Sequence, residues 1–161
     1  LVSFDLANPD LKLLQRMVGD SVKVKERIVE QDPHEKGIRK ALNLGHTFGH
    51  AFESWALKRK PILHGYAVAF GLIPELYLSV IKTGFPTEKM RQTVTFIKEN
   101  YGTLNITCDD YDELIELMHH DKKNQNGIIN FTMMGGIGDI RINQTATVEE
   151  IKEALDFFRE G

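Results

Sequence analysis

The chain has 161 residues, enough for one domain with a hydrophobic core of its own. Hydrophobic residues make up 42% and charged residues 27%, and the net charge of −3 argues against a nucleic-acid-binding surface. The single cysteine, Cys108, excludes an internal disulfide and favours a reducing, cytoplasmic setting. No apolar run approaches the roughly 20 residues that span a membrane, and no signal peptide is evident, so we expect no membrane partner.

Hydrophobic periodicity predicts three helices in the first half of the chain. Apolar residues near a 3.6-residue period indicate a helix over about residues 9–31, and the Asp32-Pro33 pair ends it. A second helix is expected over about 38–57. The third, from about 64 to 84, is apolar nearly all round, which is typical of a buried central helix.

The second half is expected to hold further helices and one hairpin. Helix starts are indicated by a proline and by two capping-box patterns, in which a Thr or Asp is followed three residues later by Glu. The predicted elements are a helix from Pro86 to near Tyr101, a helix from Asp110 (with Glu113) to about His120, strands at 128–134 and 137–142 around Gly135-Gly136, and a helix that begins with Thr147 and Glu150. The expected fold is a mainly α-helical domain with one small β-hairpin.

The second predicted helix is the most informative segment, because its polar face is unusual. At about 100° per residue, four polar side chains fall within roughly 60° of one another, and Glu53 continues their line: Arg39, Asn43, His46 and His50. Two histidines at i, i+4 have the spacing that lets both side chains converge on one metal or one substrate. This stripe predicts the wall of an active site.

Two glycines and a third histidine support a functional interpretation of this helix. Gly45 and Gly49 each cost roughly 1 kcal/mol in a helix interior, so something must approach the backbone closely there. His64 stands at the start of the apolar helix, and an antiparallel turn would bring it near His46. Two or three imidazoles suit Zn²⁺, although a catalytic site also needs an oxygen ligand and an open position. The segment is therefore a candidate metal centre.

Basic residues near the stripe are candidates for anion binding. Arg39 lies on the stripe and Lys25 on the preceding helix, and both could make charge-assisted hydrogen bonds with an anion. Lys122 and Lys123 follow the fifth helix, where a favourable interaction with the helix dipole is the better explanation on local grounds. Cys108 has no base close in sequence, so we assign it no nucleophilic role.

The run from Lys25 to His64 resembles the 3-dehydroquinate synthase family of sugar-phosphate cyclases. The family pattern is a Lys on one helix, an acidic loop, Arg-x-x-x-Asn-x-Gly-His-[Thr/Ser]-x-Gly-His-Ala, and then Leu-His-Gly. The matching residues are Lys25, Asp32, Glu35, Gly37, Arg39, Asn43, Gly45, His46, Thr47, Gly49, His50, Ala51 and Leu63-His64-Gly65, and Asp121-Lys122-Lys123 is similar to a later Asp-Lys-Lys element. The resemblance covers essentially the whole chain as the family's C-terminal α-helical domain.

The resemblance implies that the rest of the active site lies on another domain. The family's metal is Zn²⁺ or Co²⁺, and two of its ligands map onto His46 and His64, whereas the third, a Glu, belongs upstream of Leu1. That N-terminal, Rossmann-like domain binds NAD⁺ and would be the partner of residues 1–161 in a homodimeric full-length enzyme. The chain begins without Met, as a piece of a longer protein does, and we assign no cofactor-binding residue to it. We expect the isolated chain to bind metal weakly or not at all, to bind no NAD⁺ and to be inactive.

The resemblance also implies a reaction and the roles of the site residues. The reaction is the conversion of 3-deoxy-arabino-heptulosonate 7-phosphate to 3-dehydroquinate and phosphate by a lyase of the shikimate pathway of aromatic amino-acid biosynthesis, with NAD⁺ as transient oxidant. His50 would be the proton relay. The substrate would be held by three kinds of contact: Lys25 and Arg39 at its carboxylate, Asn43 by a hydrogen bond, and Lys122 or Lys123 at its phosphate.

One departure from the family pattern and three alternatives stay open. Many members have Glu after Leu-His-Gly, and Tyr66 stands there in this chain, so the group that orients His64 is undecided. Other sugar-phosphate cyclases, with aminocyclitol or valiolone products, would carry the same motifs. A metal-dependent alcohol or glycerol dehydrogenase fits less well, because a neutral alcohol needs no cluster of basic residues. A stand-alone helical module would use His46 and His64 only for folding and would bind zinc tightly.

Overall fold

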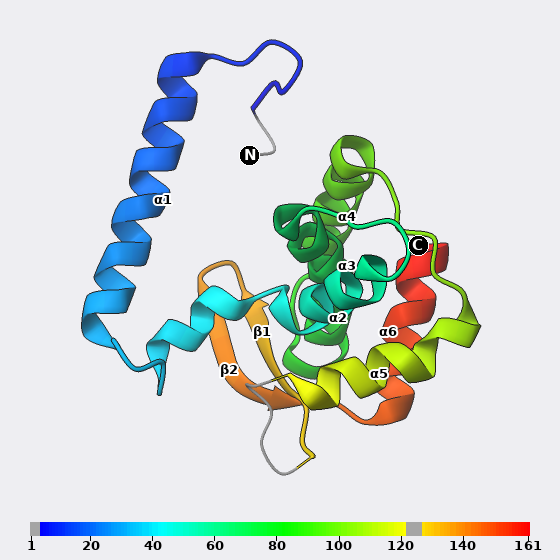
Figure 1. Ribbon diagram of the computed structural model, residues 1–161. Helices are drawn as coiled ribbons and strands as arrows, with labels where there is room; N and C mark the ends of the chain where they lie inside the picture. Colours follow the sequence, from blue (N-terminus) through cyan, green and yellow to red (C-terminus); the bar gives the residue numbers. More distant parts are fainter. Residues whose placement is uncertain (1–3, 122–126) are drawn as a thin grey trace. The chain divides into compact units, whose positions relative to one another are not determined.

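The computed structural model describes residues 4–121 and 127–161. The chain divides into two units, residues 1–42 and 43–161, and each is described separately. Its elements are mainly α-helical with one antiparallel hairpin, which confirms the predicted fold class (Figure 1). Lys122 and Lys123, two of the predicted substrate-binding residues, lie outside the described residues.

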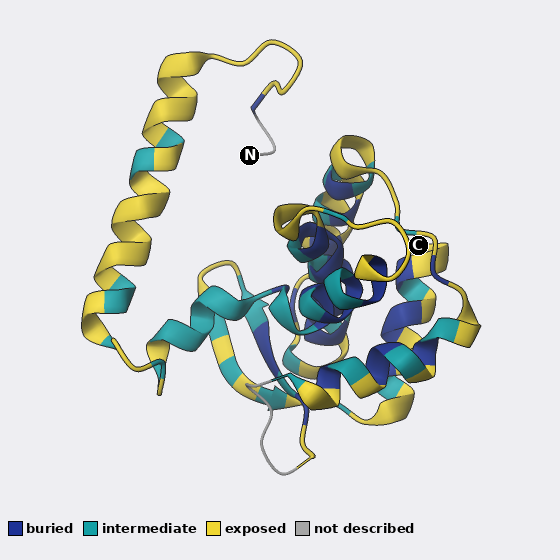
Figure 2. Ribbon diagram, viewed as in Figure 1, coloured by how far each residue is buried: buried dark blue, intermediate teal, exposed yellow. Residues whose placement is uncertain are grey.

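The first unit consists of a long helix, a loop and most of a short 3-10 helix. Helix α1 (Leu11–Gln31) starts at Asp10, whose carboxylate accepts hydrogen bonds from the backbone N–H groups of Lys12 and Leu13 at 3.0 and 3.2 Å. The helix buries none of its residues (Figure 2). The 3-10 helix η1 (Ile38–Asn43) ends where the second unit begins.

The helix predicted over residues 38–57 is interrupted. η1 ends at Asn43, and α2 (His46–Leu57) begins only after Gly45, whose φ of +82° is left-handed. Glycine adopts this conformation readily because it has no Cβ. The polar residues before Gly45 therefore do not continue the helical face of the histidines after it, and the prediction of one stripe of four side chains on one helix is wrong.

Helix α3 (His64–Thr83) is the centre of the second unit (Figure 1). It packs against four other elements: α2, α4 (Thr87–Tyr101), α6 (Val148–Glu160) and strand β1 (Asn130–Gly136). The core between them is aliphatic and aromatic, and its largest fully buried side chains include Phe48, Phe52, Leu78 and Phe131. The prediction that the third helix is the buried central one is confirmed (Figure 2).

Helix α3 also corrects the expectation that no apolar run reaches membrane-spanning length. Among the described residues it is the helix that is long and apolar enough to cross a membrane, with a mean hydropathy of 1.3 over an 18-residue window. Within this unit 56% of that window is buried. A core helix surrounded by other elements needs the same composition, and the packing of α3 accounts for it.

Glycines allow α2 and α3 to pack closely. A Cβ at Gly49 would lie 3.1 Å from the carbonyl oxygen of Ala67, and a Cβ at Gly71 would overlap the carbonyl oxygen of Gly45. Side chains at these positions would force the two backbones apart. The close approach expected at the glycines of the motif is thus made by a neighbouring helix.

The helix start expected at Pro86 is confirmed, since α4 begins at the next residue, and one of the two predicted capping boxes is confirmed. Thr107 and Asp110 form a capping box on a short 3-10 helix, η2 (Cys108–Asp110), so the side chain of Asp110 does not cap α5 (Tyr111–His120) as predicted. The sequence pattern identified the right aspartate but the wrong partner, because Thr107 also lies three residues from it. The capping box at Thr147 on α6 is confirmed.

The hairpin is confirmed with a shifted turn. β1 pairs antiparallel with β2 (Asp139–Thr145), and the turn lies at Ile137-Gly138 rather than at Gly135-Gly136. Gly138 has a φ of +81°, the kind of conformation for which hairpin turns favour glycine. Three glycines within four residues leave the position of the turn ambiguous in the sequence.

Candidate metal centre

Three histidines meet where α2 and α3 begin. His46 and His50 lie one turn apart on α2, and His64 is the first residue of α3. Their ring centroids are separated by 5.3, 5.5 and 5.8 Å, and one ring nitrogen from each lies within 4.8 Å of those of the other two. This spacing lets three imidazoles converge on one cation.

Each imidazole is held in place through its Nδ1 atom. The Nδ1–H groups donate as follows: His46 to the carbonyl oxygen of Leu44 at 3.2 Å, His50 to Oδ2 of Asp121 at 3.0 Å, and His64 to Oε2 of Glu53 at 2.9 Å. A donating Nδ1 fixes the tautomer and leaves the lone pair on Nε2. Nε2 is therefore the atom that each ring can offer to a metal.

The groups behind the rings are those that metal-binding histidines require. A carboxylate or carbonyl that accepts a hydrogen bond from the second ring nitrogen orients the ligand and raises its basicity. Two of the three acceptors are carboxylates, and the side chain of Asp121 is only 12% exposed. Three imidazoles with such partners suit Zn²⁺ or Co²⁺ and leave a further coordination position for an oxygen ligand. The donor set fits the metal that the family resemblance implies.

An open cavity of about 380 Å³ adjoins the histidine cluster. Its lining comes from α2 and from the end of α5: His50, Glu53, Ser54, Leu117, His120 and Asp121. His50 thus belongs both to the cluster and to the cavity wall, which is the place required of a group that exchanges a proton with a bound molecule. His120, predicted only as a helix-end residue, also faces this space.

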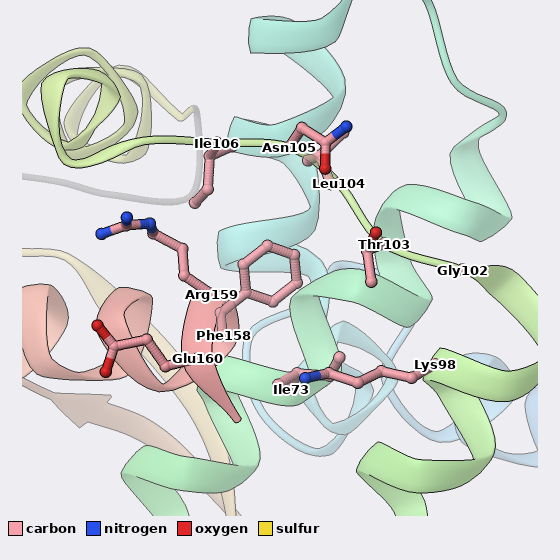
Figure 3. Close-up of a pocket in the computed structure, with 10 residues that line it drawn as sticks. All are labelled: Ile73, Lys98, Gly102, Thr103, Leu104, Asn105, Ile106, Phe158, Arg159 and Glu160. Carbon is pink, nitrogen blue, oxygen red and sulfur yellow. The ribbon is translucent and has the colours of Figure 1, made fainter.

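A second cavity, of about 290 Å³ and more enclosed, has no predicted site residue in its lining. Figure 3 shows its walls, in which the charged ends of Arg159 and Glu160 lie well apart from the ammonium of Lys98. The Arg159 guanidinium donates a hydrogen bond to the hydroxyl of Tyr111 at 3.3 Å. The polar groups of this cavity do not converge on a common point, so we do not regard it as the functional site.

Arg39 is positioned by the loop of the first unit. The carboxylate of Asp32 accepts hydrogen bonds from the backbone N–H groups of Lys36, Gly37 and Arg39 at 3.0, 2.7 and 3.1 Å, and the Arg39 guanidinium donates to the carbonyl oxygen of Pro33 at 2.8 Å. The bond from Gly37 is the main reason that the pKa of Asp32 lies below its ordinary value. The acidic residue of the motif loop therefore organises the turn that presents Arg39.

Among the described residues, the structure brings the three imidazoles of the predicted site together. Lys25 lies in α1 and Arg39 in η1, both in the first unit, so their participation in one site with the histidines stays a prediction. Asn43 is the last residue of η1 and the first of the second unit. The contact of Lys122 or Lys123 with phosphate also stays a prediction, because these residues lie outside the described ones.

Three acidic residues around the histidines were missed as contributors. Glu53 was noted on the helical face and Asp121 in a motif, but neither was recognised as a histidine partner. Asp121 lies 71 positions from His50 in the sequence, a distance at which no spacing rule applies. Glu75 was overlooked, although an acidic residue in the middle of an apolar helix is itself a signal.

Comparison with known proteins gives the family of the chain. Residues 3–124 match the family model described as 3-dehydroquinate synthase C-terminal. The chain is 60% identical over 159 residues to the 3-dehydroquinate synthase of Parabacteroides distasonis, which covers 98% of the chain and 45% of that protein. It is 39% identical over 145 residues to the 3-dehydroquinate synthase of Leptospira interrogans, and this match covers 88% of the chain and 40% of that protein. The chain thus spans less than half the length of these relatives.

Solved structures share the fold. A 2-deoxy-scyllo-inosose synthase complexed with carbaglucose-6-phosphate, NAD⁺ and Co²⁺ matches with a TM-score of 0.71 and 24% identity over 93% of this chain and 41% of that one. A 2-epi-5-epi-valiolone synthase from Streptomyces hygroscopicus with NAD⁺ and Zn²⁺ bound matches with a TM-score of 0.70 and 21% identity, and the match covers 93% of this chain and 40% of that one. At these identities the structures speak for the fold alone, whereas the sequence match decides the family. The chain belongs to the 3-dehydroquinate synthase C-terminal family.

Proposed function

We propose that this chain is the metal- and substrate-binding half of a 3-dehydroquinate synthase, which converts 3-deoxy-arabino-heptulosonate 7-phosphate to 3-dehydroquinate and phosphate. The observation that carries the proposal is the cluster of three imidazoles with hydrogen-bonded Nδ1 atoms. The 60% identity to a synthase supports it. The other half, an N-terminal domain that binds NAD⁺ and supplies the remaining metal ligand, would be its partner in a homodimeric, cytoplasmic enzyme of the shikimate pathway.

In this proposal His46 and His64 hold the metal through their Nε2 atoms. Bound Zn²⁺ or Co²⁺ would supply Lewis-acid polarisation of a substrate hydroxyl. The carbonyl of Leu44 and the carboxylate of Glu53 keep the two rings oriented. The hydrogen bond from His64 Nδ1 to Glu53 supports the view that Glu53 orients His64, at a site where Tyr66 replaces the glutamate of many family members.

His50 is the proton relay in this proposal. Its Nδ1–H is engaged by Asp121, so a proton can be accepted or returned at Nε2. The hydrogen bond to Asp121 also fixes the orientation of the His50 ring. The position of His50 between the cluster and the open cavity lets it reach a molecule bound there.

Basic residues hold the anionic groups of the substrate. One nitrogen of the Arg39 guanidinium donates to Pro33, which leaves further N–H groups for a carboxylate. Lys25 joins Arg39 at the carboxylate, Asn43 donates a hydrogen bond to the substrate, and Lys122 or Lys123 reaches the phosphate.

A chimaera tests the proposed function. Residues 3–161 replace the matching part of the Parabacteroides distasonis synthase, and phosphate release from the heptulosonate phosphate is measured with NAD⁺ and Zn²⁺ or Co²⁺. We expect turnover, and we expect a His50→Ala variant to lose about 10²–10⁴-fold in kcat. A folded chimaera that binds NAD⁺ and metal but releases no phosphate would contradict the proposal.

The main competing function is the reaction of a different sugar-phosphate cyclase, because the two solved structures described above are such enzymes. The carboxylate of the substrate separates the two possibilities. The chimaera should prefer a heptulose phosphate that bears the carboxylate, and an Arg39→Ala variant should lose about 10–100-fold of that preference in kcat/KM, the worth of a charged hydrogen bond. A wild-type preference for the substrate without the carboxylate would favour the other cyclases.

A further inference from the structure

Glu75 is a buried carboxyl group in the middle of α3, and the proposed site does not use it directly. Its side chain is 0% exposed, and its Oε2 atom has no hydrogen-bond partner among the described residues. Burial raises its pKa to about 8. A carboxyl group is costly in such surroundings, so its remaining contacts are informative.

Those contacts lead to the first turn of α2. Oε1 of Glu75 accepts a hydrogen bond at 3.1 Å from the backbone N–H of Thr47, the residue that follows His46. The backbone N–H groups of Gly45 and Phe48 also lower the pKa of the carboxyl, against the larger effect of burial. The carboxyl group therefore faces the amino end of the helix that carries two of the three histidines.

This end of α2 has no cap of its own. The first turn of any helix leaves N–H groups without partners, and a side-chain oxygen at the residue before the helix usually accepts one of them. Here that residue is Gly45, which offers no side chain. Glu75, 28 residues later in the sequence, supplies the missing acceptor from the neighbouring helix.

Other contacts hold the same turn. The hydroxyl of Thr47 donates to the carbonyl oxygen of Asn130 in β1 at 2.9 Å, and the backbone of Gly71 lies directly against Gly45. The carbonyl of Leu44, just before the turn, accepts the hydrogen bond that orients His46. The position of that carbonyl, and hence of the imidazole, depends on how the first turn of α2 is anchored.

We propose that Glu75 is a positioning residue of the metal centre, which caps α2 from inside the core and so holds His46 and the carbonyl of Leu44 in metal-binding geometry. Glu75 acts through the backbone of Thr47 and contacts neither metal nor substrate. The proposal rests on the proposed metal centre for its function. The positioning itself is a property of the metal-free chain and can be measured there.

Three variants of the 161-residue chain test the proposal. Glu75→Gln keeps an acceptor oxygen, Glu75→Leu removes it at similar volume, and Ser79→Ala is the matched control. Ser79 is buried one turn further along α3 and bonds to β1 rather than to α2, with its hydroxyl accepting from Met134 N–H at 3.1 Å. The ¹⁵N spectrum of the histidine rings reports the tautomer of His46 without metal, and hydrogen exchange reports the Thr47 amide.

We expect the Leu variant to lose the Nδ1–H tautomer of His46 and the protection of the Thr47 amide, whereas the Gln variant and the Ser79→Ala control keep both. Zn²⁺ titration of the same variants in the chimaera should give an affinity about 10–100-fold weaker for the Leu variant, as for other outer partners of metal ligands. Should the Leu variant not fold, Glu75→Asp replaces it, because the shorter side chain withdraws the acceptor, and the same losses are expected.

Two outcomes separate the proposals from each other. A folded chimaera whose histidine signals do not respond to Zn²⁺ would count against the metal centre, while the tautomer of His46 in the 161-residue chain would still decide the role of Glu75. An acceptor-free variant with an unchanged His46 spectrum and unchanged Thr47 protection would overturn the positioning role. An equal loss in the Ser79→Ala control would do the same, since it would show a general effect of disturbing α3.

Discussion

Helices α1 and α3 have nearly the same length, 21 and 20 residues, and opposite surroundings. α1 buries none of its residues, and Val18 and Val22 are 55% and 59% exposed, whereas α3 forms the centre of a core. The two halves of the predicted site divide in the same way. The histidines stand on the buried pair α2 and α3, while Lys25 and Arg39 stand on α1 and η1, which bury none of their residues.

This contrast indicates that the two parts of the predicted site, the imidazoles for a metal and the basic residues for an anion, are positioned by different means. Imidazoles that share a metal must be placed within a few tenths of an ångström, and rigid packing of two helices achieves this. Cationic side chains reach an anion over a wider range of positions, because their stems are long and flexible. The geometry of the imidazole cluster is therefore encoded within residues 43–161, whereas the position of the basic residues relative to it stays a prediction.

The largest expected effect is the pH dependence of the unfolding free energy that the burial of Glu75 in α3 should cause. Its pKa is raised by burial from 4.5 to about 8, so between these values the folded chain keeps a proton that the unfolded chain has released. The free energy of unfolding should therefore fall as the pH rises from about 4.5 to about 8, by at most about 5 kcal/mol. Urea denaturation across this range measures it. Glu75→Gln should abolish this fall.

The control for this pH dependence is Glu26→Gln, which changes an exposed glutamate of α1. It should leave the slope of stability against pH as it is in the wild type. A slope that survives in Glu75→Gln would show that another group carries the pH dependence and that Glu75 is ionised in the folded chain.

The next largest effect on the unfolding free energy is expected from alanine substitution of Gly71 in α3, compared with Gly19 in α1. In Gly71→Ala the new Cβ would overlap the carbonyl oxygen of Gly45 and lie 2.5 Å from the backbone nitrogen of Gly49, so α2 and α3 must separate. We expect a loss of about 2–3 kcal/mol in unfolding free energy. In Gly19→Ala of α1 the Cβ meets no atom within 4 Å, and the better helix propensity of alanine should stabilise that helix by about 0.5–1 kcal/mol.

Chemical denaturation of both alanine variants measures this contrast, and zinc affinity adds a second reading. Because Gly71 lies against the backbone at Gly45 and Gly49 on either side of His46, its substitution should weaken Zn²⁺ binding by the chimaera, whereas Gly19→Ala should not. Equal stability of Gly71→Ala and the wild type would mean that the two helices tolerate a wider separation than the structure shows.

The sequence predicted the helices and the imidazole cluster because both depend on short-range spacing. Periodicity located α1 and α3 to within two residues at each end, and the i, i+4 spacing of His46 and His50 placed them on one face. It did not predict the break at Gly45, since a left-handed glycine and a helical one look alike in a sequence. The partner helix decides between them, because the turn at Gly45 fits against Val68 and Leu72.

The partners of the histidines were beyond sequence reasoning for a different reason. Glu53 bonds to a ring 11 residues away, Asp121 to one 71 residues away, and Glu75 caps a helix 28 residues upstream. Each of these contacts depends on how two elements cross, and no periodicity contains that information. The motif identified the groups that would bind a metal, and the fold identified the groups that hold them.

The smallest effect is expected in α1, where the substitution of a valine by alanine is compared with the same substitution in α4. Val18→Ala removes an exposed side chain of α1 and should change the unfolding free energy by no more than about 0.5 kcal/mol. Val94→Ala in α4 removes one that is only 6% exposed and should cost about 2 kcal/mol. Denaturant midpoints of the two variants measure both values. A cost near 2 kcal/mol for Val18→Ala in the 161-residue chain would show that α1 is packed within this chain. A cost that arises only in the chimaera would show that the other half of the enzyme covers α1 and so positions Lys25.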